Sequence, residues 1–592
     1  MTDVSMTALT ADAGKLSATS RWLSMPGVFT LLLIAVSAAY APSLSGGYIW
    51  TDDFNIANNP DLRGWGGLAR IWLTTSSEQY FPLTFTTFWI ERQVWGDWPL
   101  ASRLVNIALH ALTATLLWSL LRELRCPGAL LAAAVFALHP LHVESVAWIT
   151  ERRNVLSGVF FLLALRAYLR AERTVEDAGA ERTRQCRRAA WGWFALALLS
   201  KSSTVTLPAV ALLVRWLETG RWTKRDLLRA APLFLMSGAM AALVIAYESA
   251  LNAASLGEHN LSRVQRVGLL GSNAWFYVLQ LFWPARLSIV YERPPPPDAL
   301  VALLPTGIWA LLLAAVFRAR RWIGRAPLVV IACFLVTLLP VSGVVPFFYL
   351  KYSLVADRFA YLPSMGVIAI AAAAICSLAK RAVGRVSLAR HGQAETEIVW
   401  RVAAGLGVLL CVALGARTAQ ESARFRSNER LWTDAIRKSP QSWIAHAMYA
   451  RTIADNPSRR EEALRHYREA LRFRPGEAMA HNNAGMVLLA LGRVEEGQAE
   501  LRTAIECNPR YVDAYLNLAA LLVRQNRSGE AVALYRQALA VSPDHPLAHL
   551  GLGQTLCGRG EIVEGQRHLR RAHEIAPQLR AGGARSAAPT RP

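Results

Sequence analysis

The sequence predicts an all-α protein: a polytopic membrane core of about eleven helices, followed by a tetratricopeptide-repeat (TPR) solenoid. Two observations support this prediction. Apolar segments recur between residues 25 and 417, and basic residues occupy many of the loops between them. Beyond residue 417, prolines recur at positions 440, 475, 509, 543 and 577, with spacings of 35, 34, 34 and 34 residues.

The composition agrees with a membrane protein. Of 592 residues, 53% are hydrophobic, and 64 Lys and Arg outnumber 42 Asp and Glu. A nucleic-acid-binding module gathers its basic residues on one soluble surface, whereas this chain carries them in short runs between apolar stretches. We therefore expect no nucleic-acid partner and interpret the positive charge as a signal of membrane topology.

The N-terminal segment, residues 1–24, is polar, and we expect it in the cytoplasm. Lys15 and Arg21 precede the apolar run 25–40, and no small-residue cleavage site closes that run. The run therefore predicts a signal anchor rather than a cleaved signal peptide. The seven cysteines form no C-x-x-C pair and show no spacing typical of a metal site.

Twelve apolar segments are candidates for membrane spans. They cover residues 25–42, 104–121, 128–148, 155–170, 190–200, 203–217, 230–247, 267–283, 303–317, 326–346, 358–379 and 399–417. Several are shorter than the ~20 residues of a perpendicular span. Interrupted helices of this kind are tolerated where they line a cavity in the protein.

Basic loops predict the orientation, because Lys and Arg are enriched on the cytoplasmic side. The basic loops are 122–127, 166–189, 215–229, 318–325 and 380–401. Segment 267–283 breaks their alternation, so we interpret it as re-entrant or interfacial. Eleven spans then remain in a membrane domain at residues 25–417, and the C-terminus lies in the periplasm of a bacterial inner membrane.

The proline spacing is the period of a TPR helix pair. The repeat that ends at Pro543 has large and small residues where the motif places them: Tyr515, Leu518, Ala519 and Leu522, then Ala531, Tyr535 and Ala538. We expect about four repeats in residues 418–579 and a disordered tail at 580–592. Such a solenoid binds peptides or other proteins in its groove.

Two adjacent carboxylates, Asp52 and Asp53, lie in the first external loop, residues 43–100. Neighbouring carboxylates raise each other's pKa or share a cation, so a divalent ion between them and a donor phosphate is compatible with the pair. Either carboxylate could act as a general base toward a hydroxyl acceptor. The alternative is an ordinary loop start, because Asp favours turns and caps.

A second polar group follows the apolar segment near residue 138: His139, His142 and Glu144, and then Arg152. Ionisable side chains are costly at membrane depth and mark functional positions there. The first three could ligate a metal, but Pro140 interrupts the helix and no fourth ligand is evident. A polar network that orients substrate or structure, or simple placement at the interface, are the other interpretations.

Two cations lie at the borders of apolar segments, Lys201 between two short helices and Arg358 at the start of segment 358–379. Fixed ammonium and guanidinium groups suit a phosphate, although each side chain could equally snorkel toward the interface. Nearby aromatic residues are expected in the interfacial belt: Phe347, Phe348, Tyr349 and Tyr352.

All these groups fall on the predicted outer face, where a lipid-phosphate-linked sugar would be presented. When a glycosyl group moves to a hydroxyl, cations stabilise the charge of the phosphate that leaves. The reaction needs no soluble nucleotide, and the sequence has no G-x-x-x-x-G-K-[ST] run. The arrangement favours a membrane glycosyltransferase.

Several motifs occur in order along the chain: Trp50-Thr51-Asp52-Asp53, Tyr80-Phe81-Pro82-Leu83-Thr84, Asn106 with His110, His139 to Trp148, Ser200-Lys201 and Ala356 to Pro363. Together with the repeats, they resemble the transmembrane and tetratricopeptide repeat-containing proteins and their bacterial homologues. This family is related to the protein O-mannosyltransferases of the GT-C fold.

The resemblance implies a GT-C-like membrane domain, a polyprenyl-phosphate-linked sugar as donor, and a periplasmic acceptor protein recruited by the TPR arm. It assigns the role of catalytic base to Asp52, with Asp53 as its neighbour or substitute. The implied substrate-binding residues are His142, Glu144, Arg152, Lys201 and Arg358. Phe81 stands where some relatives carry Arg, so the resemblance does not fix the sugar as mannose.

Two other functions stay open at this point. The chain could be a non-catalytic membrane scaffold whose TPR arm gathers envelope proteins. It could also be an oligosaccharide or O-antigen ligase, which would share the class of donor but use a different acceptor.

Overall fold

The computed structural model describes residues 24–73, 80–177, 180–252, 261–293, 297–388, 393–576 and 579. Over these residues the chain forms helices joined by turns and loops, without a strand, which confirms the all-α prediction. Two compact units are present, residues 1–431 and 432–592. The predicted cytoplasmic segment, up to residue 23, and the predicted tail at 580–592 lie outside the described residues.

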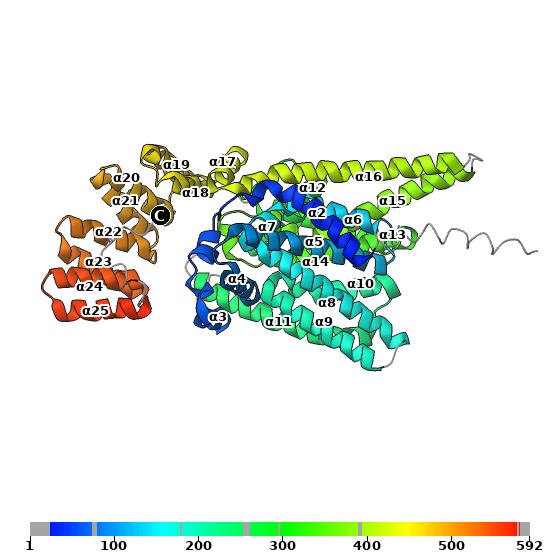
Figure 1. Ribbon diagram of the computed structural model, residues 1–592, viewed down its shortest axis with the longest axis horizontal. Coiled ribbons are helices and arrows are strands. Elements are labelled where there is room, and N and C mark those ends of the chain that lie inside the picture. The colour runs from blue at the N-terminus through cyan, green and yellow to red at the C-terminus, as the bar shows by residue number, and fades with distance from the viewer. Residues whose placement is uncertain are drawn as a thin grey trace, which may run out of the picture. The chain divides into compact units, whose positions relative to one another are not determined.

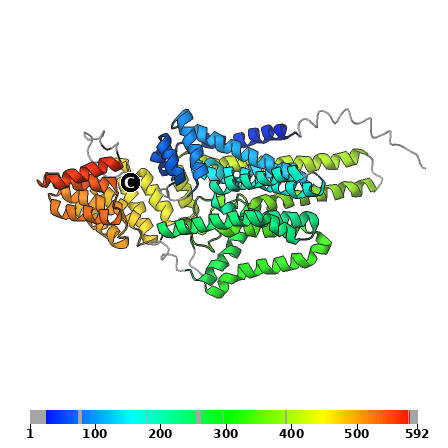
Figure 2. The same ribbon diagram turned by 90° about the horizontal axis from the view of Figure 1, so that it is seen from below.

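Seven helices of the first unit are long and apolar enough to cross a membrane. They are α2 (Met25–Leu44), α5 (Pro99–Glu123), Ile149–Arg173 within η4 (Ile149–Glu151) and α8 (Arg152–Asp177), Lys224–Tyr247 within α11 (Lys224–Asn252), α13 (Ala299–Ile323), Ser364–Ala382 within α15 (Ser364–Leu388), and Arg401–Arg426, which starts in α16 (Gln393–Ser422). Most of the long helices run roughly parallel to one another (Figures 1 and 2). The first unit is therefore a multi-pass membrane domain.

The described helices provide seven candidate spans, where the sequence predicted about eleven. An eighth arises if α6 (Ala129–Leu138) and the helical segment Pro140–Ala147 count as one span bent by 52°. The other predicted spans fall on helices that are too polar or too short: α9 (Ala180–Ser200), the 13-residue α10 (Leu207–Thr219) and the 13-residue α14 (Ala326–Leu338). Segment 267–283 forms most of α12 (Arg263–Phe282), which is also not among the candidate spans.

A small apolar core fixes the loop that follows α2 against the start of the candidate span at Ile149. The loop folds into η1 (Asp53–Ala57), η2 (Pro60–Leu62) and α3 (Gly64–Leu73), and α4 (Pro82–Trp95) follows. The core consists of Ile56, Leu62, Phe85, Phe88, Trp89 and Ile149. Arg103 of α5 is fully buried and donates hydrogen bonds to the carbonyl oxygens of Gly46 and Gly47. These contacts hold the residues around position 52 beside the turn at residue 150.

The second unit contains four helix pairs with the predicted period. They are α18 (Trp443–Ile453) and α19 (Arg460–Phe473), α20 (Ala478–Ala490) and α21 (Val494–Cys507), α22 (Val512–Arg524) and α23 (Ser528–Val541), and α24 (Pro546–Gly558) and α25 (Ile562–Ile575). This is the predicted α-solenoid. The proposed domain boundary after residue 417 falls within α16, whereas the compact unit begins at Trp432.

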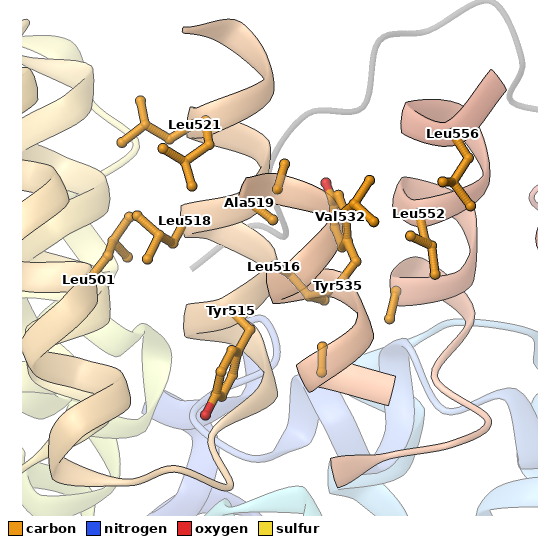
Figure 3. Close-up of a cluster of buried hydrophobic side chains, with 14 residues drawn as sticks. Leu501, Tyr515, Leu516, Leu518, Ala519, Leu521, Val532, Tyr535, Leu552 and Leu556 are labelled. Atoms are coloured by element: carbon orange, nitrogen blue, oxygen red, sulfur yellow. The ribbon is translucent and has the colours of Figure 1, made fainter. Parts of the chain in front are cut away.

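The apolar core of this unit runs continuously from one repeat to the next. Figure 3 shows Leu501 of α21 facing Leu518 of α22, while Tyr535 of α23 lies toward Leu552 of α24. Because each repeat buries its apolar face only against its neighbours, the solenoid depends on close approach of consecutive helices.

Gly553→Ala is expected to destabilise the repeats by about 1–3 kcal/mol, the usual cost of overpacking. A Cβ at Gly553 would lie 2.8 Å from the carbonyl oxygen of Gly565 and 2.8 Å from Leu569 Cγ. Gly558→Ala on the same helix is the matched control, since its Cβ would meet no atom within 4 Å. Thermal unfolding followed by circular dichroism checks this, and equal melting temperatures for both variants would contradict it.

Candidate functional site

Asp52 lies at the end of the loop that follows α2 and has no exposed surface. Its Oδ1 accepts hydrogen bonds from the amide of Thr150 (2.9 Å) and from the Thr150 hydroxyl, and its Oδ2 accepts one from the amide of Ile49 (3.2 Å). Burial raises the pKa of the Asp52 carboxyl to about 6, although these hydrogen bonds oppose the shift. The group is therefore a carboxylate at neutral pH, with a pKa suited to a general base.

An open cavity lies beside Asp52, with an empty space of about 700 Å³ that includes the solvent at its mouth. Its lining is mostly aromatic, with a few polar and charged groups: Trp50, Thr51, Asn55, Phe81, Thr84, Phe85, Phe88, Trp148, Thr150, Arg153, Phe348, Tyr349, Tyr352 and Arg358. An apolar lining with a few convergent polar groups is typical of small-molecule sites.

Trp50 and Trp148 form a stacked pair in the wall of this cavity. Their ring centroids are 4.9 Å apart and the rings are inclined by 9°, while Tyr352 meets Trp50 edge-on at 6.1 Å. Trp50 has a φ of 47°, a left-handed conformation that is unusual for a bulky residue. Its amide donates to Asn428 Oδ1 at 2.7 Å, which helps to hold this conformation.

Arg358 and Arg153 supply the positive charge of the cavity, and both pair with buried carboxylates. The Arg358 guanidinium pairs with Glu144 and lies 3.3 Å from Glu151 Oε1, and its backbone amide donates to Glu144 Oε2 at 3.0 Å. The guanidinium also lies over the Tyr349 ring, 4.0 Å from its centroid. Arg153 donates to Glu151 Oε2 at 3.1 Å. Both cations are thus held in fixed positions.

A second, smaller cavity of about 280 Å³ is also lined by Arg358, which the two cavities share. Lys201, half-buried between α9 and η5 (Ser202–Thr206), contributes its ammonium here and donates to Asn154 Oδ1. Asn154 in turn donates to Glu151 Oε2 at 2.6 Å. Burial lowers the pKa of Lys201 to about 7.

The structure brings several of the predicted site residues together. Arg358, Glu144 and Lys201 meet around the two cavities, and Asp52 lies behind the wall of the larger one. Asp53 is half-buried at the start of η1 and is not part of the cavity lining. The geometry therefore distinguishes the two acidic neighbours, of which the resemblance assigned the role of base to Asp52 and that of neighbour or substitute to Asp53.

Arg152 lies apart from both cavities. Its five guanidinium N–H groups have partners within the fold: Nε donates to Asn106 Oδ1 (2.8 Å), Nη1 to Thr87 Oγ1 (3.2 Å) and to Glu91, and Nη2 to Glu91 (3.0 Å) and to the carbonyl of Ser102 (2.9 Å). These bonds join α4, α5 and α8, so the structure places Arg152 in the framework that supports the site.

His142 is also buried away from the cavities. Its Nδ1 lies 2.8 Å from the carbonyl oxygen of Phe136 and its Nε2 lies 2.9 Å from Ser364 Oγ. His139 uses both ring nitrogens in the same way, toward the carbonyl of Leu281 (2.9 Å) and the amide of Leu141 (3.2 Å). One interpretation of the sequence was that these histidines and Glu144 ligate a metal. In the structure, all four ring nitrogens of the two histidines lie in hydrogen bonds within the protein.

Sequence reasoning assigned no role to Thr150, Trp148 or Arg153, although all three line the main cavity. Arg153 is adjacent to Arg152, and the two differ in the direction in which their side chains leave α8: only that of Arg153 reaches the cavity. The aromatic group at 347–352 was expected in a membrane belt, yet Phe348, Tyr349 and Tyr352 line the cavity. The cation–π contact between Tyr349 and Arg358 could have been suspected from their closeness in sequence.

Comparison with known proteins agrees with the repeats. Protein-family models of the tetratricopeptide repeat match residues 458–511, 482–546 and 522–587. Among solved structures, the crystal structure of MamA covers 28% of this chain and 96% of its own, at 16% identity and a TM-score of 0.24, which is too low to carry an argument.

Curated relatives match the membrane domain as well. The protein O-mannosyl-transferase Tmtc3 of Drosophila melanogaster is 23% identical over 572 residues, which cover 79% of this chain and 58% of the relative. Human protein O-mannosyl-transferase TMTC1 is 27% identical over 532 residues, which cover 78% of this chain and 57% of the relative. Human protein O-mannosyl-transferase TMTC4 is 26% identical over 496 residues, which cover 72% of this chain and 64% of the relative. The chain thus spans about three fifths of the length of these relatives.

The matches to Tmtc3 and TMTC1 cover 79% and 78% of this chain, more than either compact unit alone. The chain itself has a multi-pass membrane domain and a C-terminal array of repeats. The chain is similar to the transmembrane and tetratricopeptide repeat-containing family.

Proposed function

We propose that this chain is a membrane glycosyltransferase of the GT-C class. It moves a sugar from a polyprenyl-phosphate-linked donor to a hydroxyl of a periplasmic protein that the TPR arm recruits. Its relatives are named protein O-mannosyl-transferases, which makes mannose the first sugar to test.

The observation that supports this function best is the chemistry collected around one cavity. A buried carboxylate of suitable pKa stands behind the wall, stacked indoles form one side, and two fixed guanidinium groups face the same space. The flat aromatic rings suit the apolar C–H face of a sugar. The carboxylate suits removal of the acceptor proton, and the cations suit the charge that develops on a leaving phosphate.

The donor phosphate is assigned to the region between Arg358 and Lys201. These cations come from separate segments, around residues 357 and 201, and the two cavities meet at Arg358. Because Glu144 and Glu151 fix the Arg358 guanidinium before any ligand binds, little reorganisation is needed when charge develops.

The proposed location is a bacterial inner membrane with the TPR arm in the periplasm. The support is the distribution of basic loops, which favours the cytoplasm for 122–127 and 380–401. The cavity and the repeats would then share one side of the membrane. A reporter fused after Arg426, beyond the last candidate span, tests this orientation: it should be exported, and a cytoplasmic reporter would contradict the proposed location.

Reconstituted full-length protein, a labelled polyprenyl-phosphate sugar and a periplasmic protein extract test the function. We expect label in protein, and parallel reactions with EDTA show whether a divalent ion contributes. Label in lipopolysaccharide but not in protein would favour an O-antigen ligase. Binding of envelope proteins to the TPR arm with no transfer from any donor tested would favour a non-catalytic scaffold.

The rate of transfer is expected to show a narrow maximum between about pH 6 and pH 7. The base form of Asp52 is lost as pH falls through its pKa of about 6, and the Lys201 cation is lost as pH rises through its pKa of about 7. Lys201→Arg keeps the charge at high pH and should remove the alkaline fall. Initial rates across the pH range check this, and an alkaline limb unchanged in Lys201→Arg would contradict it.

A further inference from the structure

Asp52 has no direct access to the main cavity. The carboxyl is 0% exposed and is absent from the cavity lining, whereas Thr150, 5% exposed, is part of that lining. The only side-chain hydroxyl bonded to Asp52 among the described residues is that of Thr150, which donates to Oδ1. Thr150, whose hydroxyl donates to Asp52, therefore lies between the carboxylate and the space where an acceptor would bind.

We propose that Thr150 relays the acceptor's proton to Asp52. This inference rests on the glycosyl transfer proposed above and adds a second catalytic residue to it. The Thr150 hydroxyl has one proton, which it gives to Asp52, and its oxygen has lone pairs that can accept a proton from another hydroxyl.

The step balances without any further reactant. The acceptor oxygen forms a bond to the anomeric carbon, and the bond from that carbon to the phosphate oxygen breaks, so the electron pair leaves with the phosphate. The acceptor's proton passes to Thr150 Oγ1 as the proton of Thr150 passes to Asp52 Oδ1. Thr150 is unchanged, Asp52 becomes neutral, and its proton returns through the same hydroxyl to water once the cavity empties.

The backbone fixes this relay in place. The Thr150 amide donates to the same carboxylate oxygen at 2.9 Å, so the residue is held to Asp52 by two bonds. Thr150 belongs to the short turn η4 (Ile149–Glu151). Trp148, directly before that turn, and Arg153, two residues after it, also line the cavity. One short segment thus places the hydroxyl among the groups assigned to the sugar and the phosphate, and such orientation is worth several orders of magnitude in rate.

Thr150→Val, which removes the hydroxyl and keeps the shape, tests the relay. We expect kcat for transfer to a protein hydroxyl to fall at least ~100-fold, the usual contribution of general-base catalysis, with the KM for donor little changed. Thr150→Ser keeps a hydroxyl and should retain most of the wild-type rate.

Azide separates a proton relay from a merely structural role. Azide anion attacks the anomeric carbon without losing a proton, so Thr150→Val should form glycosyl azide from the donor at the wild-type rate. An unchanged rate toward protein hydroxyls in Thr150→Val would overturn the relay, and so would an equal fall in both reactions. If the wild-type protein gives neither product from any donor, the proposed glycosyl transfer is itself wrong. That outcome differs from failure of the relay, in which the wild-type protein is active.

Discussion

Asp52→Asn is expected to lower kcat for sugar transfer by roughly 10²–10⁴-fold, because an amide cannot take the acceptor's proton. The neutral side chain keeps the size of the carboxyl and can still accept hydrogen bonds from Thr150. Its NH₂ group, however, faces the amide of Ile49, which now donates to Asp52 Oδ2 at 3.2 Å. A loss of about 1–3 kcal/mol in stability should accompany the kinetic effect.

Asp61→Asn is the matched control for this variant. Asp61 lies in the same loop and pairs with Arg70 at 2.6 Å, outside the cavity lining, so its transfer rate should match that of the wild type. Rates are measured with labelled donor on protein that elutes as a monodisperse peak. Equal transfer by Asp52→Asn and the wild type would show that Asp52 is not the base, and loss in Asp53→Asn alone would move the role to Asp53.

Arg358→Met is expected to have the largest effect on stability, a loss of about 3–5 kcal/mol. The Arg358 and Glu144 side chains are 4% and 1% exposed, and Glu151 has no exposed surface. Removing the cation leaves Glu144 buried without its counter-charge, which costs far more than the loss of a pair in water. Thermal unfolding in detergent gives the measurement.

A second substitution shows whether the cost comes from the orphaned carboxylate. Arg358→Met combined with Glu144→Gln should recover a large part of the lost stability, because no unpaired charge then remains at that point. Arg70→Met removes a surface pair whose Arg side chain is 48% exposed and should change stability by no more than ~1 kcal/mol. Equal melting temperatures for Arg358→Met and Arg70→Met would show that the buried Arg358–Glu144 pair does not have this effect on stability.

The sequence predicted the repeats closely and the membrane spans less closely. Pro509 and Pro543 stand at a fixed spacing that depends on local helix-pair geometry, and local geometry is what a sequence pattern records best. Whether segment 203–217 crosses a membrane depends instead on its neighbours. It becomes η5 and a 13-residue helix, since a short apolar helix packs inside a protein as readily as it faces lipid.

Within the site, the sequence could indicate which charged residues to consider. It could not indicate which side chains face the cavity or which uncharged residues bond to them. Arg358 and Lys201 are conspicuous because cations are rare between apolar segments. Arg152 and Arg153 are indistinguishable in sequence, yet one fills all its donors inside the framework and the other faces the cavity. Thr150 carries no pattern at all, because its role depends on a contact 98 residues away along the chain.

The most direct test of the central claim is the intact mass of periplasmic proteins from cells that carry either the wild-type gene or the Asp52→Asn gene. We predict that at least one protein from the wild-type cells is heavier by the mass of a sugar residue, and that the same protein from the variant cells lacks this addition. Identical masses across the periplasmic proteins of both strains, with the two membrane proteins present in equal amount, would contradict the account.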